Sequence, residues 1–355
     1  MIYQQRGRFC QRFFQIAATA VMLAFSYLTT NITTVDASEY AKSVYPPGFR
    51  GSMSGLVPPT PGTYVSSYNY FYSGSASGAA AASVSLDHFG GNFSLQTDLE
   101  VDVVTFIEIP NVLWMTPYKI LGGKLGFGAF MPIGWQDVTV DVNALATLTL
   151  PRLGVTLQKG VQLSVNQDTV EFGDPLALAL VGWDRGNWHW NLAGTVSIPI
   201  GAYDKTSLTN LGFNHWAFDS TASVTWFDPH KGYEASVAAG FTFNAENPDT
   251  NYKSGTEFHL EGALMKHLSK AFAIGLAGYH YNQVTGDSGA GAVLGDFKGR
   301  VSALGPNVNY NFKLGGTPVF TSARWLHEFG AKNRLEGDTA VLTVTIPFGG
   351  GGGHN

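Results

Sequence analysis

Glu257, His259 and Glu261 are the residues whose types and spacing most directly suggest chemistry. On an extended strand they would share one face, because successive side chains point to opposite sides. A histidine between two carboxylates could bind a divalent cation or relay a proton. The alternative is a hydrogen-bonded polar wall, and the sequence offers no ligand on another strand to complete a metal site. We therefore expect the polar wall, with no metal and no cofactor.

A second pair of interest is Ser254 with His259. A serine nucleophile needs a histidine base within reach and a third polar group that orients the histidine. Residues five apart lie on opposite faces of a regular strand, which argues against this pair. A lipid hydrolase stays open as an alternative, but we expect that the chain is not an enzyme and has no catalytic residues.

Two polar segments could bind ions. Residues 247–251, of sequence Asn-Pro-Asp-Thr-Asn, offer oxygen ligands for calcium together with Asp287 and Ser288. They lack the spacing of a calcium-binding helix-loop-helix motif, and Asn-Pro and Asp are typical turn residues. The glycine-rich run 286–291 is not followed by a helical pattern, which a phosphate-binding loop would need. Both segments are therefore expected to be loops.

The elements that must carry these residues are strands, because apolar and polar residues alternate with a period of two. The clearest segments are 187–200, 216–226, 233–243, 304–314 and 342–348. The first four are about ten to fourteen residues long, whereas strands of soluble proteins usually have five or six. Aromatic residues end several apolar faces, namely Trp188, Trp216, Trp226 and Tyr233. The pattern favours an all-β, antiparallel transmembrane barrel, with Leu192, Val224 and Phe241 facing lipid rather than the dry core of a sandwich.

Connection lengths alternate along the chain. Short turns are expected at 184–186, 228–231, 267–269 and 315–316, and long loops at 201–215, 244–254, 283–297 and 329–338. Bacterial outer-membrane barrels have short periplasmic turns and longer external loops. Counting back into the N-terminal third, where the alternation is less regular, gives about fourteen strands, with twelve as the alternative.

The composition agrees with a membrane barrel. Charged residues are 13 % of the 355 residues, about half the usual share, whereas aromatic residues reach 13 % and there are 43 glycines. The net charge of −5 comes without a basic stripe, so nucleic acid is not an expected partner.

Residues 1–37 have the pattern of a secretory signal peptide. Arginines precede an apolar run at 13–28, and residues 35–37 (Val-Asp-Ala) offer small side chains before a cleavage site. A retained membrane anchor is the alternative, although the run is shorter than the roughly 20 residues that span a bilayer. The only cysteine, Cys10, lies in this segment, so a mature chain would have no disulfide.

The remaining chain divides by composition. The segment 38–62 is rich in Pro, Gly and Ser and cannot form a central strand, because proline has no N–H to donate. We expect it to lie on the periplasmic side and to be a candidate plug of the lumen. The barrel is expected at 63–348, followed by a glycine-rich tail at 349–355.

Charged and polar residues on the polar faces are expected to line a narrow or plugged lumen, where they would tune selectivity rather than catalyse. These residues are Asp219, Glu234, Glu257, His259, Glu261, Asn309, Lys313, Arg324 and Glu328.

Several loop sequences resemble a known family of outer-membrane proteins, named after the meta-pathway of phenol degradation. The resemblance covers about residues 45–348 and is strongest after 170. It is carried by Pro199-Ile200-Gly201-Ala202-Tyr203-Asp204, Asn210-Leu211-Gly212-Phe213-Asn214-His215-Trp216, Asn247-Pro248-Asp249-Thr250-Asn251-Tyr252, Gln283-Val284-Thr285-Gly286-Asp287-Ser288-Gly289 and Gly295-Asp296-Phe297-Lys298-Gly299. The family-motif residues singled out in these loops are Tyr203, Asp204, Asn214, Asn247, Pro248, Asp249, Tyr252, Gln283 and Asp287.

The resemblance implies an outer-membrane barrel that passes small hydrophobic or aromatic compounds by passive uptake. Its partners would be the lipid bilayer, those compounds and the barrel assembly machinery, which recognises a terminal aromatic residue such as Phe348. The seven residues that follow Phe348 depart from that pattern. Two alternatives stay open: a structural or surface-interaction barrel acting through its external loops, and an outer-membrane lipid hydrolase.

Overall fold

The computed structural model describes residues 42–86, 91–151, 154–292 and 295–348. The segments predicted as signal peptide and glycine-rich tail lie outside these residues. No helix in the described part of the chain is long and apolar enough to cross a membrane.

The described residues form one antiparallel sheet of fourteen strand segments. In chain order these are β1 (Gly62–Leu86), β2 (Gly91–Ile120), β3 (Gly123–Phe130), β4 (Ile133–Leu150), β5 (Val155–Phe172), β6 (Leu176–Arg185), β7 (Trp188–Ser197), β8 (Ala217–Asp228), β9 (Tyr233–Asn244), β10 (Glu257–His267), β11 (Phe272–Gln283), β12 (Arg300–Leu314), β13 (Thr317–Lys332) and β14 (Glu336–Phe348).

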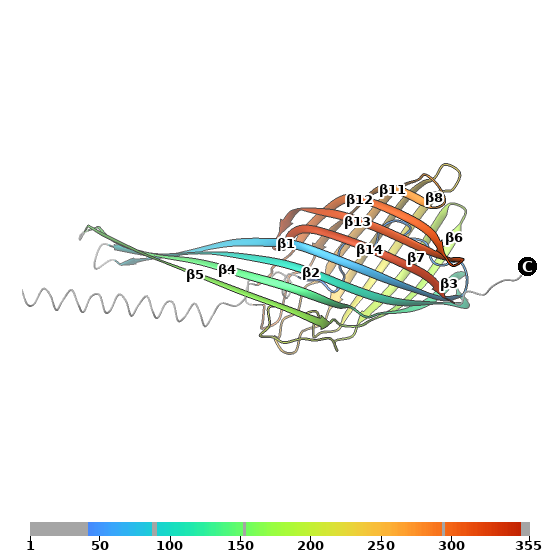
Figure 1. The fold of residues 1–355 in the computed structure, drawn as a ribbon. Helices are drawn as coiled ribbons and strands as arrows, with labels where there is room; N and C mark the ends of the chain where they lie inside the picture. Colours follow the sequence, from blue (N-terminus) through green and yellow to red (C-terminus); the bar gives the residue numbers. More distant parts are fainter. Residues whose placement is uncertain (1–41, 87–90, 152–153, 293–294, 349–355) are drawn as a thin grey trace, which may run out of the picture. The chain divides into compact units, whose positions relative to one another are not determined.

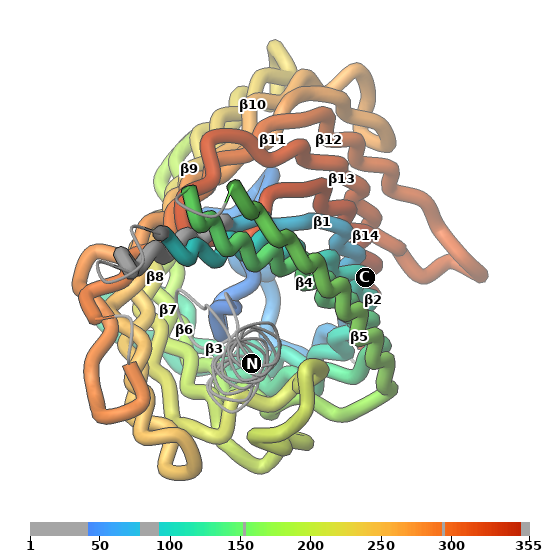
Figure 2. Tube along the Cα trace, turned by 90° about the vertical axis from the view of Figure 1, so that its left-hand side faces the viewer, coloured from blue at the N-terminus to red at the C-terminus, as the bar shows by residue number. Residues whose placement is uncertain are grey.

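The sheet closes on itself, because β1 pairs with β14 on one side and with β2 on the other. Figure 2 shows the resulting ring of strands. Closure removes the open sheet edge at the seam between β1 and β14, where each unpaired backbone group facing hydrocarbon would cost several kcal/mol. The prediction of an antiparallel transmembrane barrel is therefore confirmed.

The ring itself contains twelve strands. Both β3 and β4 pair with β2, so together they form one long strand with an interruption. On their other side, β3 pairs with β6 and β4 pairs with β5, so β5 and β6 form a second interrupted strand. The interruptions lie at Pro132 and Pro175, which have no N–H to donate to a ladder. They are held together where Gly173 N donates to Pro132 O at 2.9 Å. Fourteen segments and a ring of twelve thus describe the same barrel.

The wall of the barrel has its polar side chains inside and its apolar side chains outside, the reverse of the arrangement in a soluble protein. Along β8, Asp219, Thr221, Ser223 and Thr225 are buried, whereas Phe218 and Val224, which alternate with them, are exposed. Leu192, Val224 and Phe241, which were expected to face lipid, are 55 %, 37 % and 44 % exposed. They face outward, as expected for a lipid-facing band around a polar lumen.

Turns and loops lie at opposite ends of the barrel. The connections between β6 and β7, β8 and β9, β10 and β11, and β12 and β13 are short, and those at 198–216, 245–256 and 284–299 are long. The loop predicted at 329–338 is shorter, because β13 continues to Lys332 and β14 begins at Glu336. Polar residues outside the bilayer can extend a strand pair without apolar alternation, so the pattern underestimates strand length there.

On one side of the barrel, β1, β2, β4 and β5 continue beyond the other strands (Figure 1). The two faces of this extension differ, as the register and the alternation of side chains require. One face is apolar and carries Leu95, Leu99, Val101, Val140, Val142, Leu163 and Val165. The opposite face is acidic and carries Asp98, Glu100 and Asp141.

Candidate functional site

The lumen is where the predicted polar residues come together. All of them except Lys313 are buried: Asp219, Glu234, Glu257, His259, Glu261, Asn309, Arg324 and Glu328. They alternate with exposed apolar residues of the same strands, so their side chains point inward. Lys313 is exposed beside the turn between β12 and β13.

Asp219 and His259 form a buried pair. His259 Nε2 lies 2.8 Å from Asp219 Oδ2, and the hydroxyls of Thr221 and Thr242 donate to the same carboxylate at 2.6 and 2.9 Å. The ring of Tyr45 stacks on the imidazole at 3.7 Å between centroids, with 11° between the planes. The pair is therefore fixed by neighbours on three strands and by the segment that precedes β1.

That segment, residues 42–61, runs inside the ring of strands (Figure 2, blue). Glu261 accepts hydrogen bonds from Gly48 N and Arg50 N. Arg324 donates in the opposite sense, from Nε to Gly48 O at 2.7 Å and from Nη2 to Phe49 O at 2.6 Å. Charged side chains thus satisfy the backbone of a segment that has no ladder partner of its own.

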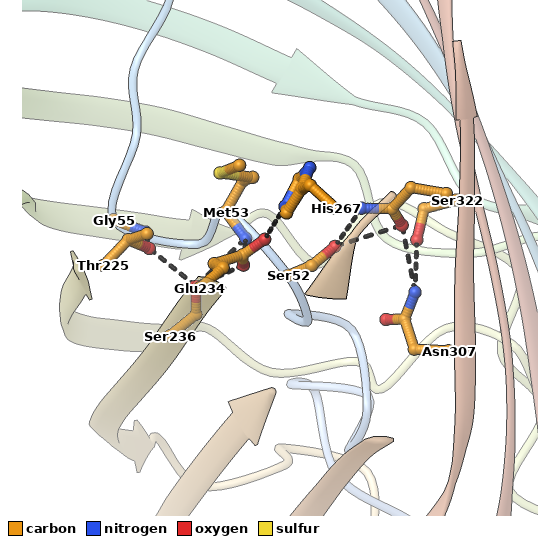
Figure 3. Close-up of polar contacts among 10 residues, drawn as sticks. Ser52, Met53, Gly55, Thr225, Glu234, Ser236, His267, Asn307 and Ser322 are labelled. Carbon is orange, nitrogen blue, oxygen red and sulfur yellow. Dashed lines mark hydrogen bonds and ion pairs between the residues drawn. The ribbon is translucent and has the colours of Figure 1, made fainter. Parts of the chain in front are cut away.

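A second attachment lies further along the segment, as Figure 3 shows. Glu234 accepts from Met53 N at 2.6 Å and lies 2.8 Å from His267 Nε2. Gly55 N donates to Thr225 Oγ1 at 2.9 Å. A Cβ on Gly55 would fall 2.3 Å from Thr225 N, so only glycine permits this approach to the wall.

Glu328 is satisfied on the other side of the lumen. It accepts hydrogen bonds from the hydroxyls of Tyr72 and Tyr279 and from Gly337 N. Tyr72 lies on β1, which shows that the lumen network crosses the seam where the barrel closes.

A cavity of about 230 Å³ lies between residues 42–61, here called the inward segment, and the strands that form the wall of the barrel. Its lining is largely apolar and comes from β1, β2, β3, β6 and the long loop at 198–216, with Val103, Ile107, Ile109, Phe130, Leu176, Leu178, Leu211 and Phe213 among the wall residues. The inward segment contributes Tyr45, Pro46, Pro47 and Phe49. Polar members of the lining are Lys42, Arg50, Gln136, Asp174, Asp219, Glu328 and Arg334, among others.

Sequence reasoning missed the apolar half of this cavity. On β2, Ile107 and Ile109 line the cavity, whereas Phe106 and Val112 of the same strand point to the opposite face and are exposed. A strand that is apolar on both faces has no period of two, which is why the N-terminal third looked irregular. The loss of alternation could have indicated an apolar patch inside the barrel, because a strand with lipid on one face and water on the other keeps its alternation.

The family-motif loops interlock at the external end. Asn247 Nδ2 donates to Tyr203 OH at 2.9 Å, and Asn214 Nδ2 donates to Asn247 Oδ1 at 2.9 Å. Asp287 accepts from Tyr252 OH, Gly255 N and Gln283 Nε2.

The other three motif residues, Asp204, Pro248 and Asp249, have their contacts within single loops. Thr206 donates its N–H and its hydroxyl to Asp204, which lowers the pKa of that exposed carboxyl. Pro248 and Asp249 occupy the turn between the bridged residues Asn247 and Tyr252.

The geometry gives little support to a serine hydrolase site or to a metal site. Neither ring nitrogen of His259 is hydrogen-bonded to a serine hydroxyl in the described residues, since Nε2 contacts Asp219 and Nδ1 has no partner there. Within the same residues, no group of three His, Cys, Asp or Glu side chains could hold a metal ion.

The family model described as "Putative MetA-pathway of phenol degradation" matches residues 86–344. No curated protein matches the chain.

Among solved structures, an outer membrane channel from Pseudomonas putida F1 is similar at a TM-score of 0.54 and 14 % identity, covering 86 % of this chain and 100 % of that one. A FadL homologue from Pseudomonas aeruginosa matches at a TM-score of 0.35 and 10 % identity, over 84 % of this chain and 93 % of that one. The first likeness supports the barrel fold, and the second is too weak to add to it. Because the family model spans most of the barrel, this chain belongs to the phenol-degradation MetA-pathway family and is an outer-membrane β-barrel.

Proposed function

We propose that this barrel is a passive uptake channel for small hydrophobic compounds, aromatic ones included. The observation that carries the proposal is the cavity of about 230 Å³ within the lumen, lined mainly by apolar and aromatic side chains. Sites for small organic ligands are typically concave, largely apolar and equipped with a few polar groups. This volume suits a molecule smaller than the drug-sized ligands that fill about 300 Å³ or more.

The extension of β1, β2, β4 and β5 supports the same proposal. Val103 and Ile107 of β2 line the cavity, and Leu99 and Val101 continue that face of the strand beyond the barrel. Strand β4 adds apolar residues in register, with Val142 opposite Leu99. A hydrophobic solute would therefore meet a largely apolar surface, interrupted at Thr105 and Gln136, from the external extension down to the cavity.

What is known of similar proteins agrees with this role. The solved relative from Pseudomonas putida F1 is described as an outer membrane channel. The family description refers to the degradation of phenol, a small aromatic compound.

We propose further that residues 42–57 plug the lumen. Four side chains of the wall, Glu234, Glu261, Thr225 and Arg324, bind the backbone of this segment. The segment fills the polar half of the lumen and leaves the apolar cavity beside it, which would favour hydrophobic solutes over water-soluble ones.

We propose a role without catalysis, because the buried histidine of the lumen is committed to a carboxylate and not to a nucleophile. We also propose that the barrel assembly machinery recognises the end of β14, where Phe348 pairs with Thr63 of β1 at the seam.

Uptake is best measured across an outer membrane with its lipopolysaccharide, because phospholipid bilayers alone pass hydrophobic solutes readily. Cells lacking their major porins would express the full chain or an empty vector, and the initial rate of labelled toluene entry would be compared. Faster entry with the protein is expected, with labelled arabinose as the polar control solute. Equal toluene rates in the two strains at matched expression would refute the uptake role.

A further inference from the structure

The lining of the lumen cavity carries hydrogen-bond donors that have no acceptor among the described residues. Arg50 Nε and Arg334 Nη1 are both buried and have no hydrogen-bond partner within the described part of the chain, and both residues line the cavity. Ser197, also in the lining, has a buried hydroxyl in the same condition. Buried donors in native proteins nearly always have a partner, and each exception calls for an explanation such as a ligand.

The two guanidinium groups are also without ion pairs. No arginine in the described part of the chain lies within 4.0 Å of a carboxylate, the ion pairs there being formed by lysines and histidines. Arg50 donates from Nη1 to Ser223 Oγ at 3.1 Å. Arg334 lies over the ring of Tyr281, 4.1 Å from its centroid. Each group therefore keeps donor capacity, since a guanidinium has five N–H donors and no acceptor.

The carboxylates around the same cavity are already occupied. Asp219 accepts from Thr221 and Thr242 and contacts His259. Asp174 accepts from Gly201 N at 2.8 Å and from Phe213 N at 2.7 Å.

Glu328, the third carboxylate of the lining, accepts from two tyrosine hydroxyls and a backbone N–H. The lining thus has filled acceptors and unfilled donors. This imbalance favours a ligand that brings acceptors into an otherwise apolar space.

We infer that the cavity recognises the carboxylate of a small aromatic acid, with Arg334 as its main anchor and Arg50 as the second donor. A carboxylate matches the forked donors of a guanidinium, and a charge-assisted hydrogen bond gains strength where water is excluded. The ring of the acid would pack among the aromatic and aliphatic side chains of the lining, such as Phe49, Phe130 and Leu178. The inference rests on the cavity of the proposed function and narrows its ligand from hydrophobic compounds in general to aromatic carboxylates.

Binding to the full-length barrel, purified in detergent, tests the inference. Saturation-transfer NMR and calorimetry would compare benzoate with benzyl alcohol, which has a similar ring but no charge. Benzoate is expected to bind more tightly to the unchanged protein. In Arg334→Gln its affinity should fall about tenfold or more, because a hydrogen bond to a charged group is lost, and that of benzyl alcohol should change little.

Two further variants sharpen the comparison. Arg334→Lys keeps the charge without the fork and should give an intermediate affinity. Arg300→Gln is the matched control, because Arg300 is exposed at the external end of β12 and does not line the cavity. The folded state of each variant is checked by its heat-modifiable mobility on gels.

Two results would overturn the inference. One is benzoate binding no tighter than benzyl alcohol to the unchanged protein, a comparison that needs no variant to fold. The other is equal benzoate affinity in Arg334→Gln and Arg300→Gln. Failure of toluene entry in cells with benzoate binding intact would remove the uptake role alone, whereas toluene entry without preferred benzoate binding would remove this inference alone.

Discussion

Asp219 of β8 and His259 of β10 meet 2.8 Å apart although β9 lies between their strands. They meet above Gly240 of β9, which pairs with both Thr221 and His259. A Cβ on Gly240 would fall 2.6 Å from the His259 ring and 2.7 Å from Ser220 O. The missing side chain of one residue therefore makes room for a contact across two strand spacings.

Gly240→Ala is expected to destabilise the barrel by about 1–3 kcal/mol, the usual cost of inserting a methyl group where no space exists. Thermal unfolding in detergent, followed by gel mobility, measures the effect. Gly262→Ala on the neighbouring strand is the control, because the nearest atom to its Cβ is 3.4 Å away. Equal midpoints for the two variants would contradict this packing argument.

Arg324→Gln should loosen the segment inside the lumen. The variant removes the charged donor to Gly48 O and Phe49 O, interactions of about 1.5–3 kcal/mol each when they involve an ion. Single-channel recordings in planar bilayers should give a higher conductance than the unchanged protein. Arg300→Gln, exposed at the barrel end, should leave it unchanged. A conductance that stays the same after complete deletion of residues 42–57 would rule out the proposed plug.

Ile107→Trp should slow toluene entry, because the larger side chain would occupy part of a cavity of about 230 Å³. The matched variant is Phe106→Trp, since Phe106 is the adjacent residue on the outward face and is 43 % exposed. Entry rates are measured in porin-deficient cells at equal protein levels. If both variants slowed entry alike, the cavity would not be the route.

Asp287→Ala should make the external loops easier to cleave. The change removes the shared acceptor of Tyr252, Gly255 and Gln283, which ties together the loops that follow β9 and β11. Protease added to intact cells should cut these loops faster, on the expectation that opening precedes cleavage. Asp249→Ala in the same loop cluster is the control, because Asp249 is exposed. Indistinguishable cleavage rates would show that the interlock does not hold the loops.

Phe348→Ala should reduce the amount of folded barrel in the outer membrane without altering the stability of the barrel that forms. Phe348 is 55 % exposed, so truncating it loses little packing. Quantifying folded protein in membrane fractions tests this, with Ile346→Ala as the comparison within β14. An unchanged yield would remove the terminal aromatic from the assembly signal.

The sequence by itself determined the barrel, because the alternation that identifies its strands is visible within each short segment of the chain. A strand between lipid and a wet lumen must alternate, and β8 and β9 do so residue by residue, with Phe218 and Val224 outward and Asp219 and Thr225 inward. The turns at 228–231 and 315–316 were predictable for the same reason, because turn residues act within a few positions.

Only the tertiary structure decided which residues fill and line the lumen. The partners of Glu261 and Arg324 are backbone atoms of Gly48, Phe49 and Arg50, more than two hundred residues away in the chain, and no periodicity encodes such contacts. The apolar cavity was hidden for a related reason, because Ile107 and Phe106 are apolar on opposite faces and erase the pattern that identifies a strand. Alternation reports which face of a strand meets lipid, whereas the contents of the lumen depend on which distant segments share it.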